Sequence, residues 1–252
     1  MKRENSRKLN QLLQTWPYGV VYTANWLYQH GIKDDRLSVY RAHGWVDALS
    51  HGAVVRSGDK FDWTGGLWAI QQQLGLKIHA GAKTALELQG YAHFLPLGKG
   101  GQIWLFGTPG QRLPAWFRKY DWSAKIRYVA TSLFAEDMLG LTEKKMPSYA
   151  VKISAPERAM FEMLHLVPQE SSFEGALHLM EGLTTLRPEL VQTLLERCWS
   201  VKVKRLFLFF AEKCNHPWLP KVSLKKVKLG KGKRLIVKGG RFDSKYQISV
   251  PA

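Results

Sequence analysis

The strongest constraint on the fold lies in the first sixty residues, where three short helical patterns precede a tight hairpin pattern. Apolar residues recur at helical spacing in the first segment, which Pro17 ends. Glycines close the next two segments, and an alternating pattern with a central turn follows them. The predicted elements are a helix at residues 7–16, helices opened by Thr23 and by Asp34 or Asp35, and strands at residues 45–49 and 53–56. This order of elements predicts a winged helix-turn-helix.

The third helix of such a fold enters the major groove with its N-terminal residues toward the base edges. We therefore expect Arg36, Ser38 and Arg41 to read bases. Arginine can bind guanine through two hydrogen bonds, and serine can contact a base or a phosphate. Lys33, before the helix, and Arg56, at the end of the hairpin, suit contacts with the DNA backbone.

Two alternatives to DNA binding stay open for this region. Residues 1–60 carry nine basic and five acidic side chains, so their positive excess is modest. Arg36 and Arg41 could pair with Asp34, Asp35 or Asp47 on a solvated helix face. A helix-turn-helix can also serve only as a protein-contact module.

The positive charge of the chain is concentrated near its C-terminal end. The chain has 37 Lys and Arg against 20 Asp and Glu, and residues 200–252 hold fourteen of the basic residues and two of the acidic ones. Such a balance points to a polyanionic partner. Because this segment is also rich in Leu, Val, Phe and Trp, we expect a folded basic surface, on which Trp218 could stack on a nucleobase. The basic residues expected there are Lys202, Lys204, Arg205, Lys225, Lys226, Lys228, Lys231, Lys233 and Arg234.

Beyond the first sixty residues the pattern predicts a mixed fold. A helix-rich pattern extends to about residue 94 and then gives way to strands. Residues 154–157 and 171–174 are typical of capping boxes at helix starts. The closing strands are predicted at residues 233–238 and 246–250. We predict an α+β chain: a winged helix-turn-helix domain at residues 1–95 and a mixed α/β domain at residues 96–252.

No pattern in the sequence indicates catalysis, a cofactor or a bound metal. Cys198 and Cys214 are too few for a disulfide framework or a zinc site. Asp121, Glu136 and Asp137 could form the metal-binding cluster of a nucleic-acid enzyme, but isolated acids do not specify one. No apolar run is long enough to span a bilayer, and the N-terminus lacks an apolar signal core. We therefore expect a cytoplasmic protein with no membrane partner, and no residue pattern indicates an enzyme.

Two parts of the chain resemble the AbiEi family of antitoxins, which belong to the type IV toxin–antitoxin systems of AbiE phage defence. The first comprises residues 63–76 (WTGGLWAIQQQLGL) and 81–94 (GAKTALELQGYAHF). The second comprises residues 200–209 (SVKVKRLFLF), 217–218, 229–234 (LGKGKR), 239–240 and 246–251 (YQISVP). With the winged-helix pattern, the resemblance covers essentially the whole chain in order.

The resemblance implies that the winged helix binds inverted repeats in its own promoter and represses transcription. It also implies that the C-terminal domain counteracts a cognate nucleotidyltransferase toxin and lends basic surface to DNA binding. The leading prediction is therefore a DNA-binding antitoxin and autorepressor without catalytic residues. Its alternatives are an RNA- or DNA-binding or -processing protein, and an antitoxin whose basic face contacts an acidic toxin directly.

Overall fold

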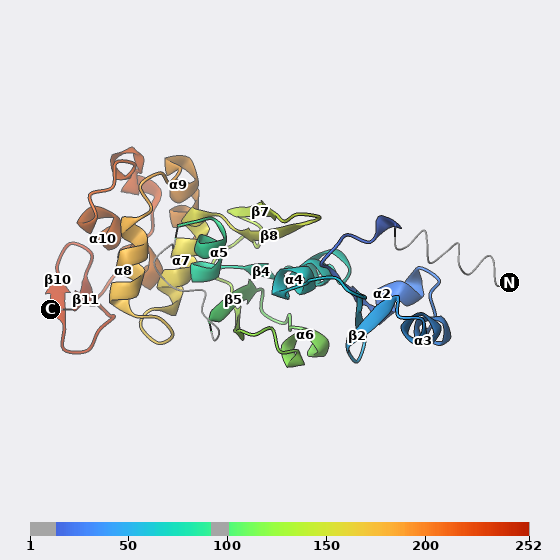
Figure 1. Cartoon of the computed structure of the whole chain (residues 1–252). Helices are drawn as coiled ribbons and strands as arrows, with labels where there is room; N and C mark the ends of the chain where they lie inside the picture. The colour runs from blue at the N-terminus through green and yellow to red at the C-terminus, as the bar shows by residue number, and fades with distance from the viewer. Residues whose placement is uncertain (1–13, 92–100, 252) are drawn as a thin grey trace. The chain divides into compact units, whose positions relative to one another are not determined.

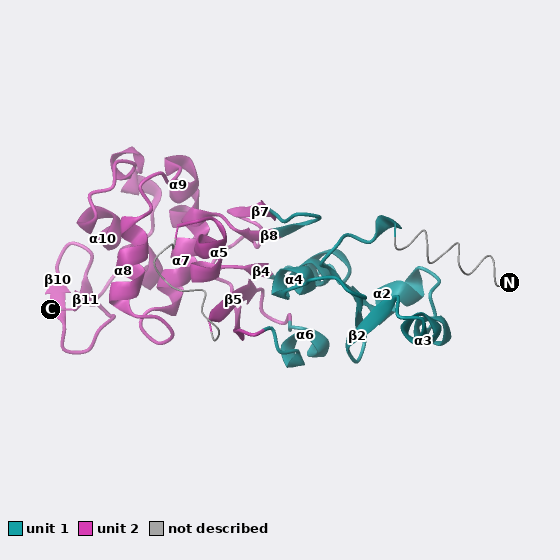
Figure 2. Ribbon diagram, viewed as in Figure 1, with its two compact units in different colours: residues 1–78, 112–122, 145–151 teal, residues 79–111, 123–144, 152–252 magenta. Residues whose placement is uncertain are grey.

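The computed structural model of the chain describes residues 14–91 and 101–251, which fall into two compact units (Figures 1 and 2). Unit 1 contains the described residues up to Ile78 together with residues 112–122 and 145–151. Unit 2 contains the remaining described residues. The predicted domain boundary between residues 95 and 96 falls outside the described residues and stays a prediction.

Unit 1 has the element order of a winged helix, as predicted. Its three strands form an antiparallel sheet in the order β1-β3-β2. The predicted second and third helices and the hairpin are confirmed, whereas the predicted first helix falls mainly on residues outside the described part. The elements are β1 (Val21–Thr23), α2 (Ala24–Gln29), α3 (Asp34–Ala42), β2 (Val46–Ser50), β3 (Ala53–Arg56), α4 (Trp63–Gln72) and α6 (Ala115–Lys119).

β1 was not predicted, because three residues are too few to show an alternating pattern. It pairs with β3, with Val21 opposite Val55. Thr23 ends this strand and also caps α2, since its Oγ1 accepts a hydrogen bond from the Trp26 amide. The side chains enclosed by these elements form an apolar core: Trp16, Val20, Tyr22, Leu27, Ile32, Leu37, Tyr40, Val46 and Val54.

Two adjacent glycines allow α4 to pack closely inside unit 1. A Cβ on Gly65 would collide with the carbonyl oxygen of Gly19. A Cβ on Gly66 would lie 2.8 Å from the Phe117 ring and 2.9 Å from the Trp122 ring. The two glycines therefore have a packing role, because only a hydrogen atom fits in place of a side chain at either position.

Unit 2 is built on a five-stranded sheet in the order β6-β5-β4-β8-β7. β5 pairs with β6 in parallel and with β4 antiparallel, and β4 pairs with β8 in parallel. α7 packs against α5 and also against α8, α9 and α10. The elements are β4 (His79–Ala80), α5 (Ala82–Leu88), β5 (Gln102–Gly107), β6 (Lys125–Ala130), β7 (Leu141–Lys145), β8 (Ala150–Ser154), α7 (Pro156–Leu166), α8 (Phe173–Glu181), α9 (Pro188–Arg197) and α10 (Val201–Lys213). Residue 145 of β7 and residues 150–151 of β8 group with unit 1.

The C-terminal part of unit 2 ends in a second, smaller sheet. Two strands were predicted here, but three short ones are present, in the order β10-β11-β9. β11 pairs with β10 antiparallel and with β9 in parallel, so the segment is not the simple strand pair expected from the sequence. The elements are the 3-10 helices η1 (Leu219–Lys221) and η2 (Leu224–Lys226) and the strands β9 (Arg234–Leu235), β10 (Arg241–Asp243) and β11 (Ile248–Val250).

A buried carboxylate joins four elements of unit 2. Glu162 on α7 accepts hydrogen bonds from His79 Nε2 at 2.8 Å, Arg158 Nε at 2.8 Å and Ser154 Oγ at 2.7 Å. It also accepts from the Ala82 amide at 3.1 Å. We call these five residues, which link β4, α5, β8 and α7, the Glu162 cluster.

The charges within the Glu162 cluster are set by burial and by Arg158. Burial lowers the pKa of His79, so its imidazole is neutral at pH 7 and donates Nε2–H to Glu162. Burial alone would raise the pKa of Glu162, but the neighbouring His79 and Arg158 outweigh it and hold this pKa at about 2. The carboxylate is therefore ionised across the neutral range and paired with the Arg158 guanidinium.

The N-caps predicted for α7 and α8 are both wrong. The Glu162 cluster explains the difference at α7, and the cap of α8 lies one residue later than predicted. Ser154 does not cap α7, because its hydroxyl donates to Glu162 and the N-cap position is taken by Ala155 without a side-chain hydrogen bond. At α8 the cap is Ser172, whose oxygen accepts from the Gly175 amide, and not Ser171 as the pattern indicated.

Replacing Glu162 with glutamine is expected to lower the free energy of unfolding by about 3 kcal/mol at pH 7. The new amide would face donors, and the Arg158 guanidinium would lose its counter-charge. The pKa of Glu162 is lower in the folded chain, about 2, than its ordinary value of 4.5. Its stabilising effect is therefore complete above pH 4.5 and lost as the pH falls toward 2. Urea unfolding of the wild type and the Glu162→Gln variant at pH 7 and pH 3 measures the loss of stability, which should be smaller at pH 3. A loss of equal size at both pH values would contradict the prediction. Glu143→Gln, at an exposed position, is the control.

Replacing Gly65 with alanine is expected to destabilise the chain by about 3 kcal/mol, because the added methyl group meets backbone that cannot rotate away. Thermal unfolding followed by circular dichroism provides the measurement. Gly182→Ala is the matched control, since a Cβ there lies no closer than 3.6 Å to another atom and its φ of −73° is ordinary. Equal melting temperatures for the Gly65→Ala and Gly182→Ala variants would show that α4 can pack farther from the Gly19 backbone without loss of stability.

Candidate nucleic-acid interface

The third helix of unit 1, α3, is held in place by its inner face. Leu37 and Tyr40, three residues apart, are buried in the core of unit 1. Asp34 and Asp35 lie in the first turn, where a negative charge stabilises the helix dipole. The sequence had suggested Asp34 or Asp35 as the N-cap of α3. Neither is the cap, because Lys33 occupies that position and is exposed.

The outer face of α3 presents the side chains predicted to read bases. Ser38 and Arg41 are exposed and Arg36 is half-buried. Arg41 Nη2 donates to Ser38 Oγ at 3.2 Å, and this hydroxyl donates to the Asp34 carbonyl at 2.9 Å. Val39 lies on the same helix with half of its surface exposed. An exposed apolar side chain in such a helix can meet a thymine methyl group.

The cationic groups of α3 are not consumed by ion pairs with nearby aspartates. Within the described part of the chain, no salt bridge joins Arg36 or Arg41 to Asp34, Asp35 or Asp47. The alternative of a salt-bridged, solvated face therefore finds no support in the geometry. Arg36 and Arg41 can offer their charge to an anionic partner.

The β2–β3 hairpin forms the wing, with Arg56 at its open end. Gly52 supplies the positive φ of 85° that the turn between the two strands requires. Arg56 is the last residue of β3, opposite Val46, and its guanidinium carbon lies 4.6 Å from the centre of the Tyr18 ring. It is therefore at the opposite end of the hairpin from the turn.

Three basic residues predicted on the C-terminal surface do not project freely into solvent. Lys204 and Arg205 are each 3% exposed, so the expectation that they lie on the basic surface is wrong. Arg205 donates to the carbonyl oxygens of residues 229, 230, 232 and 247 and thereby holds the glycine-rich loop against α10. Lys202 is half-buried, with its Nζ donating to the carbonyls of His165 and Val167 at 3.0 and 2.6 Å.

The other six predicted basic residues are exposed in unit 2: Lys225, Lys226, Lys228, Lys231, Lys233 and Arg234. Lys221, Lys238, Arg241 and Lys245 are exposed as well, and the overall charge of residues 200–252 was the only signal for them. Lys233 Nζ lies 4.9 Å from the centre of the Phe242 ring, which is 43% exposed. The surface therefore combines cations with an accessible aromatic ring.

Trp218 cannot stack on a nucleobase, contrary to one expectation. Its side chain is 4% exposed, and its Nε1 donates to the Leu183 carbonyl at 2.8 Å. Its ring stacks on His216, with centroids 5.0 Å apart. The basic residues around it in sequence had suggested a surface position, but the side chain packs inward.

The described residues do not assemble the acids into a metal site. No group of three or more His, Cys, Asp or Glu residues in this part of the chain could hold a metal ion. Glu136 instead forms an exposed ion pair with Arg197 at 3.7 Å. Cys198 is buried, and burial raises its pKa to about 11. None of the helices in residues 14–91 and 101–251 is long and apolar enough to cross a membrane.

A solved structure with the same overall fold is that of the Rv2827c protein from Mycobacterium tuberculosis, with a TM-score of 0.59. The two chains are 15% identical, and the match covers 96% of this chain and 89% of that one. At this identity the likeness shows the fold alone. The comparison with curated protein sequences finds no match.

Two family models together match nearly the whole chain. The first, described as the N-terminal domain of the AbiEi antitoxin transcriptional regulator, matches residues 5–97. The second, described as the AbiEi antitoxin transcriptional regulator of a type IV toxin–antitoxin system, matches residues 100–251. Regulators and antitoxins of this kind are not a class of enzymes. The chain belongs to the AbiEi antitoxin family of transcriptional regulators of type IV toxin–antitoxin systems.

Proposed function

We propose that this protein represses its own operon by binding inverted repeats in the promoter, and that it counteracts a cognate nucleotidyltransferase toxin. The proposal of DNA binding is supported by the placement of α3. Leu37 and Tyr40 anchor its inner face in the core, while its cationic outer face is accessible. In this proposal Arg36, Ser38 and Arg41 contact bases, and Lys33 and Arg56 contact the backbone. Such a regulator acts at its operon, in the cytoplasm.

The functional division of the chain is proposed at residues 95 and 96, a few residues before the junction of the segments matched by the two family models, residues 5–97 and 100–251. Residues 1–95 would select the DNA sequence. Residues 96–252 would serve antitoxicity and add phosphate contacts through the exposed lysines at positions 225, 226, 228, 231 and 233 and through Arg234. An RNA- or DNA-processing activity receives no support, because the described acids form no metal-binding cluster.

The combined substitution Arg36→Ala and Arg41→Ala should lower the affinity for a promoter fragment carrying the inverted repeat by at least about tenfold, since each good bidentate contact discriminates by about 1–3 kcal/mol. Electrophoretic mobility shift at fixed salt concentration is the measurement. Binding to an unrelated fragment should fall much less, because phosphate contacts dominate non-specific binding.

A matched control for this experiment is Arg118→Ala with Lys119→Ala, which removes the same charge from exposed positions on α6 of the same unit. The control should shift the promoter fragment like the wild type. Unchanged shifts with the α3 variant would refute that helix as the reader. When the α3 variant is expressed from an unrelated inducible promoter, it should still protect cells from the toxin; loss of protection would place antitoxicity in the same helix.

Changing Lys225, Lys226 and Lys228 together to glutamine should make the dependence of log K on log salt less steep. Each lost phosphate contact changes the slope by about 0.9, so a change of about 2 to 3 is expected for the triple variant. Titrations between 50 and 200 mM salt, on promoter and unrelated DNA, test this. The change should be the same on both fragments, and an unchanged slope would remove these lysines from the DNA interface.

A further inference from the structure

The strand β6 lies at one end of the five-stranded sheet and has a free edge among the described residues. It pairs there only with β5. The amides of Lys125 and Thr131, at either end of this pairing, donate to carbonyls on the β5 side. Because the direction of the N–H groups alternates along a strand, the amides of Ile126, Tyr128 and Ala130 point toward the free edge. An exposed edge of this kind is a template for another strand.

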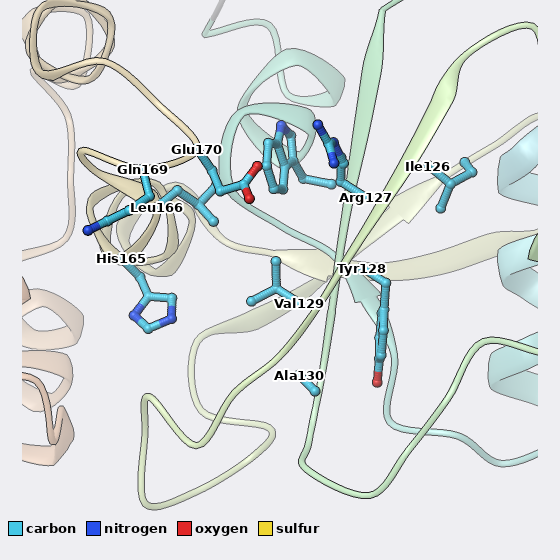
Figure 3. A pocket seen from close by; sticks show the side chains of 10 residues that line it. Ile126, Arg127, Tyr128, Val129, Ala130, His165, Leu166, Gln169 and Glu170 are labelled. Atoms are coloured by element: carbon cyan, nitrogen blue, oxygen red, sulfur yellow. The ribbon is translucent and has the colours of Figure 1, made fainter.

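A cavity of about 500 Å³ lies along this edge (Figure 3). β6 forms one wall of it, and the end of α7 with the residues that follow forms the other, including Leu166, Gln169 and Glu170. A second hollow of about 270 Å³ shares Trp104, Leu166 and Glu170 with it. Room therefore exists beside the strand for the side chains of an added segment.

One residue that lines the cavity has a buried polar atom without a hydrogen-bond partner. Arg127 and Val129 lie on the α7 side of β6 in Figure 3, while Ile126 and Tyr128 lie on the other side. Arg127 Nε is buried without a hydrogen-bond partner. Within the described residues no salt bridge joins Arg127 to Glu170, the acidic residue of the cavity wall. A buried donor of this kind needs an acceptor, and a carboxylate matches the guanidinium best.

The charge of β6 decides what can pair with it. The strand carries Lys125 and Arg127 on one face and has no acidic residue. A second copy of β6 would bring like charges together, which disfavours self-pairing. Lys202 Nζ donates to the carbonyl of His165, one of the residues that line the cavity. Burial and the nearby Lys202 lower the pKa of His165, so its ring is uncharged at neutral pH.

We propose that β6 accepts an extended acidic segment of a partner protein as an added strand. Two carboxylates of the segment, two residues apart, would face Lys125 and Arg127, and an apolar side chain would lie beside Val129. The outward amides at the edge would supply backbone hydrogen bonds, and the cavity would supply side-chain selectivity. An antiparallel arrangement is expected, because it is slightly more stable per residue than a parallel one. This proposal does not depend on DNA binding by unit 1.

The test uses two fluorescein-labelled peptides and the full chain. The acidic probe is Thr-Val-Thr-Glu-Thr-Glu-Thr, with both ends blocked, and its counterpart has lysine in place of both glutamates. Fluorescence anisotropy should give at least about tenfold tighter binding of the acidic probe, equal to 1.4 kcal/mol. Arg127→Glu should abolish this preference and improve binding of the lysine probe, a gain that a misfolded variant could not produce.

The backbone part of the proposal is tested at Ala130, an exposed residue of the edge. Ala130→Pro removes one outward amide and should weaken the acidic probe by about tenfold, whereas Ala130→Val keeps the amide and should not. Equal affinity of wild type for the two probes would overturn the proposal. So would equal binding of the acidic probe by the proline and valine variants.

Discussion

The architecture of unit 2 depends on one buried carboxylate. Glu162 is almost fully enclosed, yet its ionised form is favoured because Arg158 supplies a counter-charge and three further groups donate hydrogen bonds. Those donors come from β4, α5, β8 and α7, which are separated in sequence by as many as 83 residues. The carboxylate therefore fixes the register of the sheet centre against its covering helices. An unpaired charge in the same place would cost several kcal/mol.

The cations predicted on the C-terminal surface divide into two groups according to what surrounds them. On α10, Arg205 and Lys202 donate to backbone carbonyls and hold neighbouring loops. The cations at positions 225–234 lie on loops and a short strand, and they remain exposed. Of these two groups, the second is the one available for phosphates or acidic protein surfaces. The net charge of a segment thus overstates its binding surface, since the guanidinium of a buried arginine can serve structure alone.

The winged helix was predictable because its signals are local. Thr23 caps α2, Leu37 and Tyr40 give α3 its apolar stripe, and Gly52 permits the wing turn. Each of these effects acts within a few residues. The residues proposed to read bases follow from the same periodicity, since positions opposite a buried stripe face outward. The family resemblance, carried by residues 63–94 and 200–251, agrees with the family matches over nearly the whole chain.

By itself the sequence determined the family, the mixed α and β character, the winged-helix order and the concentration of positive charge near the C-terminus. Tertiary structure decided which cations are buried, why Ser154 does not cap α7, and how the closing strands pair. It also decided that residues 112–122 and 145–151 group with unit 1 and that β6 is an edge strand among the described residues. These features depend on contacts between residues far apart in the chain. Local periodicity reports which face of an element is apolar, but it does not report which distant partner will cover that face or leave it open.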